Sequence, residues 1–140
     1  MKSTPSRSAG KNSRPAAFRL AYAKRFLAAY KQAWEKRDAE LAAHLFTRDV
    51  HYWEEPFARP IVGREDVYTH WKKFTHHQDH IHFYVQHFYR DAHMLVAEWT
   101  CTFALRPGGE RRKLAGVFLA DFYGRQVRSF RQYAQRRSLD

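Results

Sequence analysis

The second half of the chain constrains the fold most, because it holds four consecutive segments with the alternating pattern of long β-strands. These segments cover residues 81–89, 94–105, 113–123 and 127–133. In the second segment the apolar side chains fall on one face, and the third is apolar on both faces, as is typical of a central strand. Pro107-Gly108-Gly109 and Gly124-Arg125 supply turns between neighbouring segments. The pattern predicts a mostly antiparallel sheet.

The first half of the chain is predicted to be mainly helical. One helix runs from about Pro15 or Ala16 to Arg37, and its apolar residues follow the i, i+1, i+4, i+7, i+8 spacing of a buried face. These residues are Phe26, Leu27, Tyr30, Ala33 and Trp34. Asp38 is a good N-cap for a short second helix that includes Leu41 and Phe46. Residues 47–49 are expected to break that helix.

A strand over residues 50–55, a loop over 56–62 and a third helix starting at Gly63 complete the predicted elements. The third helix carries a buried stripe of Val67, Trp71 and Phe74. The order is therefore helix, helix, strand, helix and four strands. We predict an α+β fold in which three N-terminal helices pack on a curved, mostly antiparallel sheet. The predicted shape is a cone-shaped α+β barrel that encloses a pocket.

Length and composition favour one domain over residues 16–140 in a reducing compartment. The 140 residues suffice for a single buried core, and the 11 Phe, 8 Tyr and 4 Trp indicate either an aromatic pocket or thick layers of packing. Cys101 is the single cysteine, so no intramolecular disulfide is possible and a cytoplasmic location is expected. No apolar run approaches the roughly 18 residues of a membrane span. No membrane association is expected.

Positive charge is concentrated at the N-terminus. Residues 1–34 hold eight Lys or Arg and no acidic residue, whereas the remaining residues hold 17 basic against 14 acidic side chains. Residues 1–15 read as a disordered basic arm, because they are rich in Pro, Ser, Gly and Asn. The arm is open to three interpretations: a transit peptide, a solubilising tail, or a grip on RNA or an acidic partner. The last would use Lys2, Arg7, Lys11, Arg14 and Arg19.

Residues 50–65, VHYWEEPFARPIVGRE, are the segment in which function is sought first. A short aromatic strand ends in two adjacent carboxylates and a proline. Alternation assigns His51, Trp53 and Glu55 to one face, which is expected to point inward. The first helix aims the Tyr30 phenol at the same interior. A carboxylate and a phenol that converge on an aromatic cavity form a proton-transfer arrangement.

The chain resembles the nuclear transport factor 2-like superfamily over about residues 18–136, and its SnoaL-like and ketosteroid isomerase-like branch over residues 29–75. Tyr30 matches the tyrosine of the isomerase oxyanion hole, Asp38 the inter-helix aspartate, and Glu55 the carboxylate base before a proline. Gly63-Arg64-Glu65 matches the start of the third helix. The resemblance implies that Glu55 removes a proton and that Tyr30 stabilises the oxyanion. Phe118 replaces the second oxyanion donor of the isomerases and cannot donate a hydrogen bond.

Further pocket residues are predicted around this pair. Trp71 matches a pocket aromatic of the family, and the strands are expected to add six more residues, namely His51, Trp53, His87, Trp99, Phe118 and Tyr133. The histidines at 76, 77, 80 and 82 lack the i, i+4 spacing of a zinc helix, so they are interpreted as surface residues. No metal or other cofactor is expected.

Two functions remain open from the sequence. The first is a small-molecule pocket for a hydrophobic or ring-containing ligand, with isomerase, cyclase or dehydratase chemistry next to a carbonyl. The second is a non-catalytic scaffold or complex subunit whose basic arm binds RNA or an acidic partner. In either case the apolar positions on the outer face of the sheet predict a homodimer.

Overall fold

The computed structural model describes residues 18–140, so the predicted arm over residues 1–15 lies outside the described residues. Three helices are present in the described part: α1 (Leu20–Glu35), α2 (Ala39–His44) and α3 (Arg64–His76). Six strands accompany them: β1 (Phe46–Trp53), β2 (Ile61–Val62), β3 (Gln78–Asp91), β4 (Met94–Leu105), β5 (Arg111–Tyr123) and β6 (Gln126–Ser138). The predicted order of elements is confirmed, with β2 as an addition.

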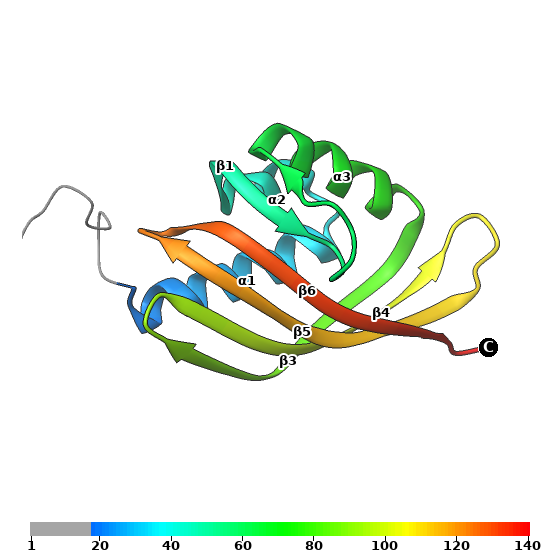
Figure 1. The fold of residues 1–140 in the computed structure, drawn as a ribbon. Helices are drawn as coiled ribbons and strands as arrows, with labels where there is room; N and C mark the ends of the chain where they lie inside the picture. Colours follow the sequence, from blue (N-terminus) through cyan, green and yellow to red (C-terminus); the bar gives the residue numbers. More distant parts are fainter. Residues whose placement is uncertain (1–17) are drawn as a thin grey trace, which may run out of the picture.

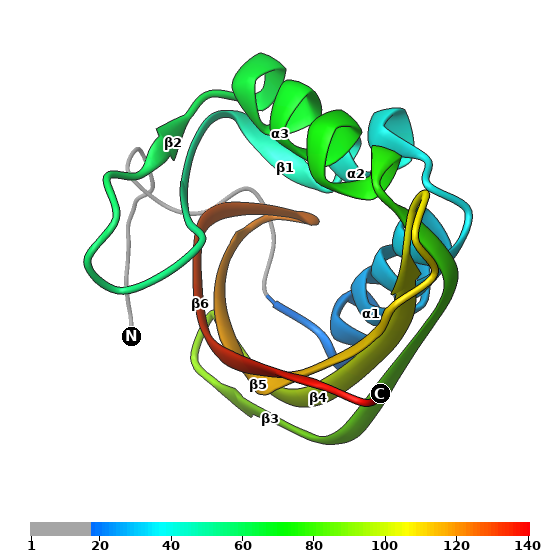
Figure 2. The ribbon, with the colours of Figure 1, turned by 90° about the vertical axis from the view of Figure 1, so that its right-hand side faces the viewer.

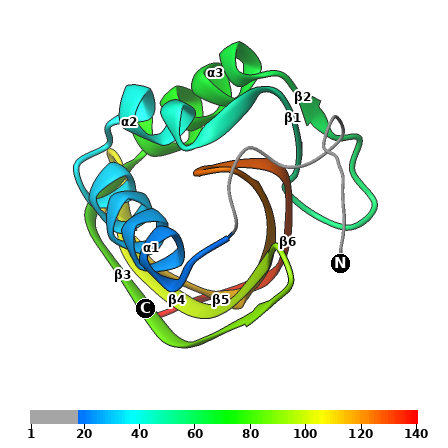
Figure 3. The ribbon, with the colours of Figure 1, turned by 90° about the vertical axis from the view of Figure 1, so that its left-hand side faces the viewer.

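The six strands form one curved, unclosed sheet in the order β2-β1-β6-β5-β4-β3. All neighbouring pairs are antiparallel except β1 and β6, which run parallel. The long strands curl around the molecule in Figure 1, and the view in Figure 2 shows that the curved sheet does not close into a complete barrel. In Figure 3, α1 lies along the concave side of the sheet, while α2 and α3 close the structure beside β1. The predicted α+β class is confirmed.

The helix α1 buries the face that its spacing predicts. Phe26, Leu27, Tyr30, Ala33 and Trp34 are all buried. Asp38 caps α2 as expected, because its carboxylate accepts a hydrogen bond from the Leu41 N–H at 3.0 Å. Among the helices of residues 18–140, none has both the length and the hydropathy that a bilayer-spanning segment requires.

The start of β1 differs from the prediction. Residues 47–49 belong to the strand, and Phe46 is its first residue rather than part of the second helix. Contacts distant in sequence explain this: Phe46 pairs with Val127 of β6, and its carbonyl accepts hydrogen bonds from the Arg64 guanidinium at 2.8 and 3.0 Å. Gln126 donates to the same carbonyl at 3.3 Å. The chain therefore leaves α2 directly into the sheet.

Two polar side chains of α1 hold the exposed edge of the sheet. The edge strand is β3, and the Glu35 carboxylate accepts a hydrogen bond from the Phe83 N–H at 2.8 Å. Lys31 donates to the Phe83 carbonyl at 2.6 Å and pairs with Glu35 at 2.7 Å. Both backbone groups of Phe83 are thus occupied, which protects an edge that could otherwise pair with another chain.

Candidate active site

The inward face of β1 is the opposite of the one that the sequence predicted. Val50 and Tyr52 are buried, whereas His51 is exposed and Trp53 is half-buried on the other face. The alternating pattern does not distinguish the inward face from the outward face here, because each face carries an aromatic ring followed by a glutamate. Pairing with β6 decides the register: Tyr52 lies opposite Phe130 and stacks on its ring at 4.8 Å. The prediction that His51 and Trp53 line the cavity is wrong.

A cavity of ≈ 370 Å³ lies where the ends of β1 and α3 face the second half of β6. The helices contribute Tyr30, Trp34, His70 and Phe74. The segment at the end of β1 contributes Tyr52, Glu54 and Glu55. The remaining lining residues are Gln78, Phe103, Leu114, Gln132, Ala134, Gln135 and Arg136. Tyr30 and Glu55 therefore share one cavity, although they come from distant parts of the chain.

The polar groups of the cavity divide between its floor and its rim. The phenols of Tyr30 and Tyr52 lie at the floor, because the exposed fractions of these two residues are only 1% and 2%. Glu54, Glu55 and Arg136 are exposed and stand at the rim. A ligand in this cavity would meet hydroxyl groups in a ring-lined interior and charged groups at the opening.

Burial keeps both phenols protonated. It raises the pKa of Tyr30 well above its ordinary value, and the neighbouring Tyr52, Cys101 and Glu54 raise it further. Burial and then the Glu54 carboxylate also raise the pKa of Tyr52. The indole N–H of Trp71 lies beside the Tyr52 hydroxyl and opposes this rise, without reaching the geometry of a full hydrogen bond. Both tyrosines are therefore hydrogen-bond donors at any physiological pH.

Glu54 and His70 form a pair at the wall of the cavity. The Nε2 atom of His70 lies 3.4 Å from a carboxylate oxygen of Glu54. This interaction lowers the pKa of Glu54, burial acts against it, and the charges of His70 and Arg136 add to the lowering. Glu54 is therefore an anion at neutral pH.

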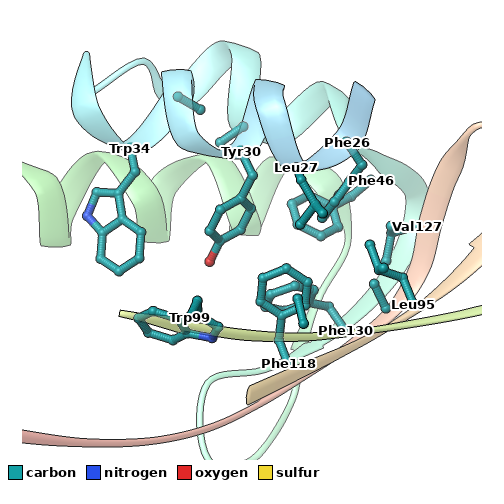
Figure 4. Close-up of a cluster of buried hydrophobic side chains, with 14 of the residues drawn as sticks. Phe26, Leu27, Tyr30, Trp34, Phe46, Leu95, Trp99, Phe118, Val127 and Phe130 are labelled. Atoms are coloured by element: carbon teal, nitrogen blue, oxygen red, sulfur yellow. The ribbon is translucent and has the colours of Figure 1, made fainter. Parts of the chain in front are cut away.

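Aromatic rings fill the interior beyond the cavity floor. Trp71, Trp99 and Phe118 are fully buried, and they belong to the core rather than to the cavity lining. Figure 4 shows the Tyr30 ring between α1 and the sheet, with its hydroxyl directed toward Trp99 and Phe118. The ring centroids of Trp71 and Phe118 lie 5.3 and 5.2 Å from that of Tyr30. The prediction that these three rings line the pocket is corrected: they are part of the buried core around Tyr30 and Trp34.

His87 and Tyr133 also lie away from the cavity. A bulge between Val85 and His87 shifts the register of β3 against β4, so that the alternation of the strand breaks and His87 is exposed. Tyr133 is 44% exposed on the outer face of β6, where it lies opposite Val117. Trp53 and Tyr133 instead line a separate hollow of ≈ 190 Å³ with Pro56, Arg131 and Gln132.

Sequence reasoning missed three residues of the cavity wall. The alternation that predicted His51 to point inward puts Tyr52 on the opposite face, and the charge of Arg136 is typical of a solvated strand residue. His70 lies three residues after Val67 and four before Phe74, so helical spacing alone could have placed it beside the buried stripe of α3. No comparable local signal exists for Arg136, which reaches the cavity because β6 is long.

Two alternatives for the candidate residues can be compared with the structure. An ion pair with Arg59 or Arg64 is the alternative to a role of Glu55 as base, but the Arg64 guanidinium donates to the Phe46 carbonyl. Within residues 18–140, no group of three or more His, Cys, Asp or Glu side chains is arranged to hold a metal ion. Cys101 is buried, and burial raises the pKa of its thiol.

A family model described as a SnoaL-like domain matches residues 25–130. The chain therefore belongs to the SnoaL-like family, within the nuclear transport factor 2-like superfamily. No curated protein sequence matches the chain.

Solved structures share the fold at low sequence identity. A hypothetical protein with a ketosteroid isomerase-like fold from Catenulispora acidiphila is 17% identical, with a TM-score of 0.70 over 77% of this chain and 83% of that chain. A putative isomerase from Bacillus subtilis is 16% identical, with a TM-score of 0.74 over 83% and 88%. An epoxide hydrolase from M. tuberculosis is 16% identical, with a TM-score of 0.69 over 82% and 84%. These likenesses establish the fold.

Proposed function

We propose that the protein binds a small hydrophobic or ring-containing molecule and moves a proton next to a carbonyl group, in a reaction of the isomerase, cyclase or dehydratase type. The observation that carries the proposal is the shared cavity of two carboxylates, Glu54 and Glu55, and two protonated phenols, Tyr30 and Tyr52. The rings of Trp34, Phe74 and Phe103 in the cavity lining suit a substrate that contains a ring.

Glu55 is the base in this proposal, and the phenols stabilise the oxygen on which negative charge develops. Phe118 cannot supply the second donor that the related isomerases use, but Tyr52 brings a second hydroxyl to the same cavity from another strand. A second preorganised hydrogen-bond donor matters for the reaction rate, because losing one donor typically reduces the rate on the order of 10²–10³-fold. Structural neighbours described as an isomerase and an epoxide hydrolase support a small-molecule reaction in this fold.

Exchange of protons next to a carbonyl tests the proposal without a known substrate. Cyclic ketones such as 2-tetralone and cyclohexanone would be incubated with the protein in D₂O, and loss of the α-proton signals would be followed by NMR. Glu55→Gln should reduce the exchange rate about 10²–10⁴-fold, as expected for loss of a general base. Tyr30→Phe and Tyr52→Phe should each reduce it about 10²-fold or more.

Glu98→Gln is the matched control, because Glu98 is an exposed carboxylate of β4 outside the cavity. It should exchange ketone protons at the wild-type rate. If the wild-type protein neither binds nor exchanges any ketone of the panel, the proposal is wrong. If the wild type and Glu55→Gln exchange ketone protons at equal rates, Glu55 is not the base.

A further inference from the structure

His70 is the residue of the cavity wall that also reaches the outer surface. Its side chain lines the ≈ 370 Å³ cavity and, with Phe74, an open hollow of ≈ 540 Å³ on the outside of α3. The rest of that hollow is formed by Lys72, Lys73, His76 and His77. The His70 side chain is 18% exposed, so it stands between the protein interior and solvent.

The surroundings of the imidazole hold it in one orientation. Glu54 lies 3.4 Å from Nε2, the Tyr52 ring meets the imidazole edge to face at 5.6 Å, and the Phe74 ring lies at 5.0 Å. A carboxylate at Nε2 favours a proton on that nitrogen, which leaves Nδ1 as the proton acceptor of the neutral ring.

We propose that His70 is the relay that exchanges protons between the cavity and bulk water, and that Glu54 is its positioning residue. The inference rests on the proposed function, because the proton that it carries is the one that Glu55 removes from the substrate. Protonated Glu55 gives its proton to neutral His70 through cavity water, which restores the carboxylate and forms the imidazolium. The imidazolium then releases a proton to water in the outer hollow and returns to the neutral ring. The same steps in reverse bring a solvent proton through His70 to Glu55, which delivers it to the enolate, so the substrate regains the proton it lost and no other reactant is consumed.

The charges around His70 are compatible with this cycle. The cavity presents Glu54, Glu55 and the neutral phenols to the ring, whereas the outer hollow presents cations. On the cavity side, the titratable and charged groups near His70 are Tyr30, Tyr52, Glu54, Glu55 and Arg136. On the side of the outer hollow, they are Lys72, Lys73, His76 and His77. His70 therefore stands between the carboxylates of the cavity and the water of the outer hollow.

Deuterium incorporation per turnover separates a relay from a structural residue. Cyclohex-3-enone would be converted to its conjugated isomer in D₂O, the rate would be followed by absorbance, and the deuterium in the product would be measured by mass spectrometry. We expect the wild-type product to contain solvent deuterium. His70→Asn should reduce deuterium per turnover at least fivefold relative to the wild type, because Glu55 then returns the same proton to the substrate.

Two further variants complete the experiment. His70→Ala with added imidazole should regain deuterium incorporation, whereas His87→Asn, which removes an exposed histidine outside the cavity, should behave as the wild type. Nitrogen-15 NMR of the His70 ring gives a readout without turnover: the proton should reside on Nε2 in the wild type and redistribute in Glu54→Gln. Equal deuterium per turnover in the wild type and His70→Asn, or a proton on Nδ1, would overturn the relay alone. A wild-type protein that performs no proton transfer would overturn the proposed function.

Discussion

Tyr30 and Trp34 lie one turn apart on the buried face of α1, but their polar atoms have different surroundings. The Trp34 Nε1 donates a buried hydrogen bond to the Gln78 side chain at 2.8 Å. No residue within 18–140 forms a hydrogen bond with the Tyr30 hydroxyl, which borders the cavity. A buried polar group without a protein partner is typical of a site that receives one from a ligand or from water.

This difference gives a prediction for two substitutions. Tyr30→Phe should change the free energy of unfolding by less than about 0.5 kcal/mol, since it removes a hydroxyl that stabilises nothing in the folded protein. Trp34→Phe should lower it by about 1–3 kcal/mol, because it leaves the Gln78 amide without its buried partner. Urea unfolding followed by circular dichroism measures both values. A larger loss for Tyr30→Phe than for Trp34→Phe would contradict the assignment of Tyr30 to function.

At the scale of elements, the contact between α1 and the edge strand β3 should depend on pH. Burial alone would raise the pKa of Glu35, but hydrogen bonds from Lys31 and from the Phe83 N–H together lower it below its ordinary value. The ionised carboxylate is therefore favoured in the folded state, and its contribution is present at neutral pH. That contribution is lost as the pH falls through the lowered pKa of Glu35.

Glu35→Gln should remove part of this dependence. The variant should be about 0.5–1.5 kcal/mol less stable than the wild type at pH 7, because it loses a charge-assisted hydrogen bond to the backbone. The difference between the two proteins should shrink as the pH falls through the lowered pKa of Glu35, where the wild-type carboxylate becomes protonated. Unfolding curves at several pH values provide the measurement, and a difference independent of pH would show that the charge of Glu35 is irrelevant.

Gly116 is the point at which β5 and β6 come closest. A Cβ atom at this position would lie 2.3 Å from the Tyr133 carbonyl oxygen and 2.7 Å from Ala134, the paired residue of β6. These are mainly backbone atoms, which cannot move without separating the strands. Gly116→Ala should therefore destabilise the protein by about 2 kcal/mol or more.

Gly108 supplies the control for this prediction. A Cβ atom there would meet only the Glu110 side chain, which can rotate away. Gly108→Ala should thus change the free energy of unfolding by less than about 0.5 kcal/mol. Thermal denaturation of the two variants compares them directly, and equal effects would mean that the close approach at Gly116 is relaxed in solution.

At the scale of the whole molecule, the outer face of the sheet is expected to bind a second copy. Val96, Val117 and Leu119 alternate with inward-facing residues of β4 and β5, and the exposed Tyr84 and Tyr133 adjoin them. The three helices cover the other side, so this apolar area has no cover within residues 18–140. We predict a homodimer packed sheet to sheet.

Analytical ultracentrifugation at micromolar concentration tests the dimer. The wild type should sediment as a dimer, and Val117→Arg with Leu119→Glu should give a folded monomer, because charges at the centre of the interface would lose their hydration. Lys72→Glu on α3 is a control for a change of charge elsewhere. A wild-type monomer would contradict the prediction.

The basic N-terminal arm is a separate prediction, because residues 1–17 lie outside the described structure. If residues 1–25 bind a polyanion, their seven basic side chains should give an affinity for fluorescent RNA that falls steeply with salt. A protein lacking residues 1–15 should lose most of that affinity and keep its fold. If the full-length and truncated proteins bind RNA with equal affinity at a low and at a high salt concentration, the arm is a tail without a partner.

The sequence by itself determined the features that depend on local periodicity. The buried face of α1, the Asp38 cap, the apolar face of β4 and the order of the elements all follow from spacings within single segments. Part of the cavity lining also follows from local patterns, because Tyr30 lies on a helical stripe and Glu55 lies between β1 and Pro56.

Only the tertiary structure decided which side chains reach the cavity. The parallel pairing with β6 turned Tyr52 inward and His51 and Trp53 outward, and a bulge carried His87 to the surface. The rings of Trp71, Trp99 and Phe118 became core because α1 packs close enough to the sheet for them to fill the gap. Strand register, bulges and layer spacing are set by contacts between residues far apart in the chain, and no local pattern encodes them.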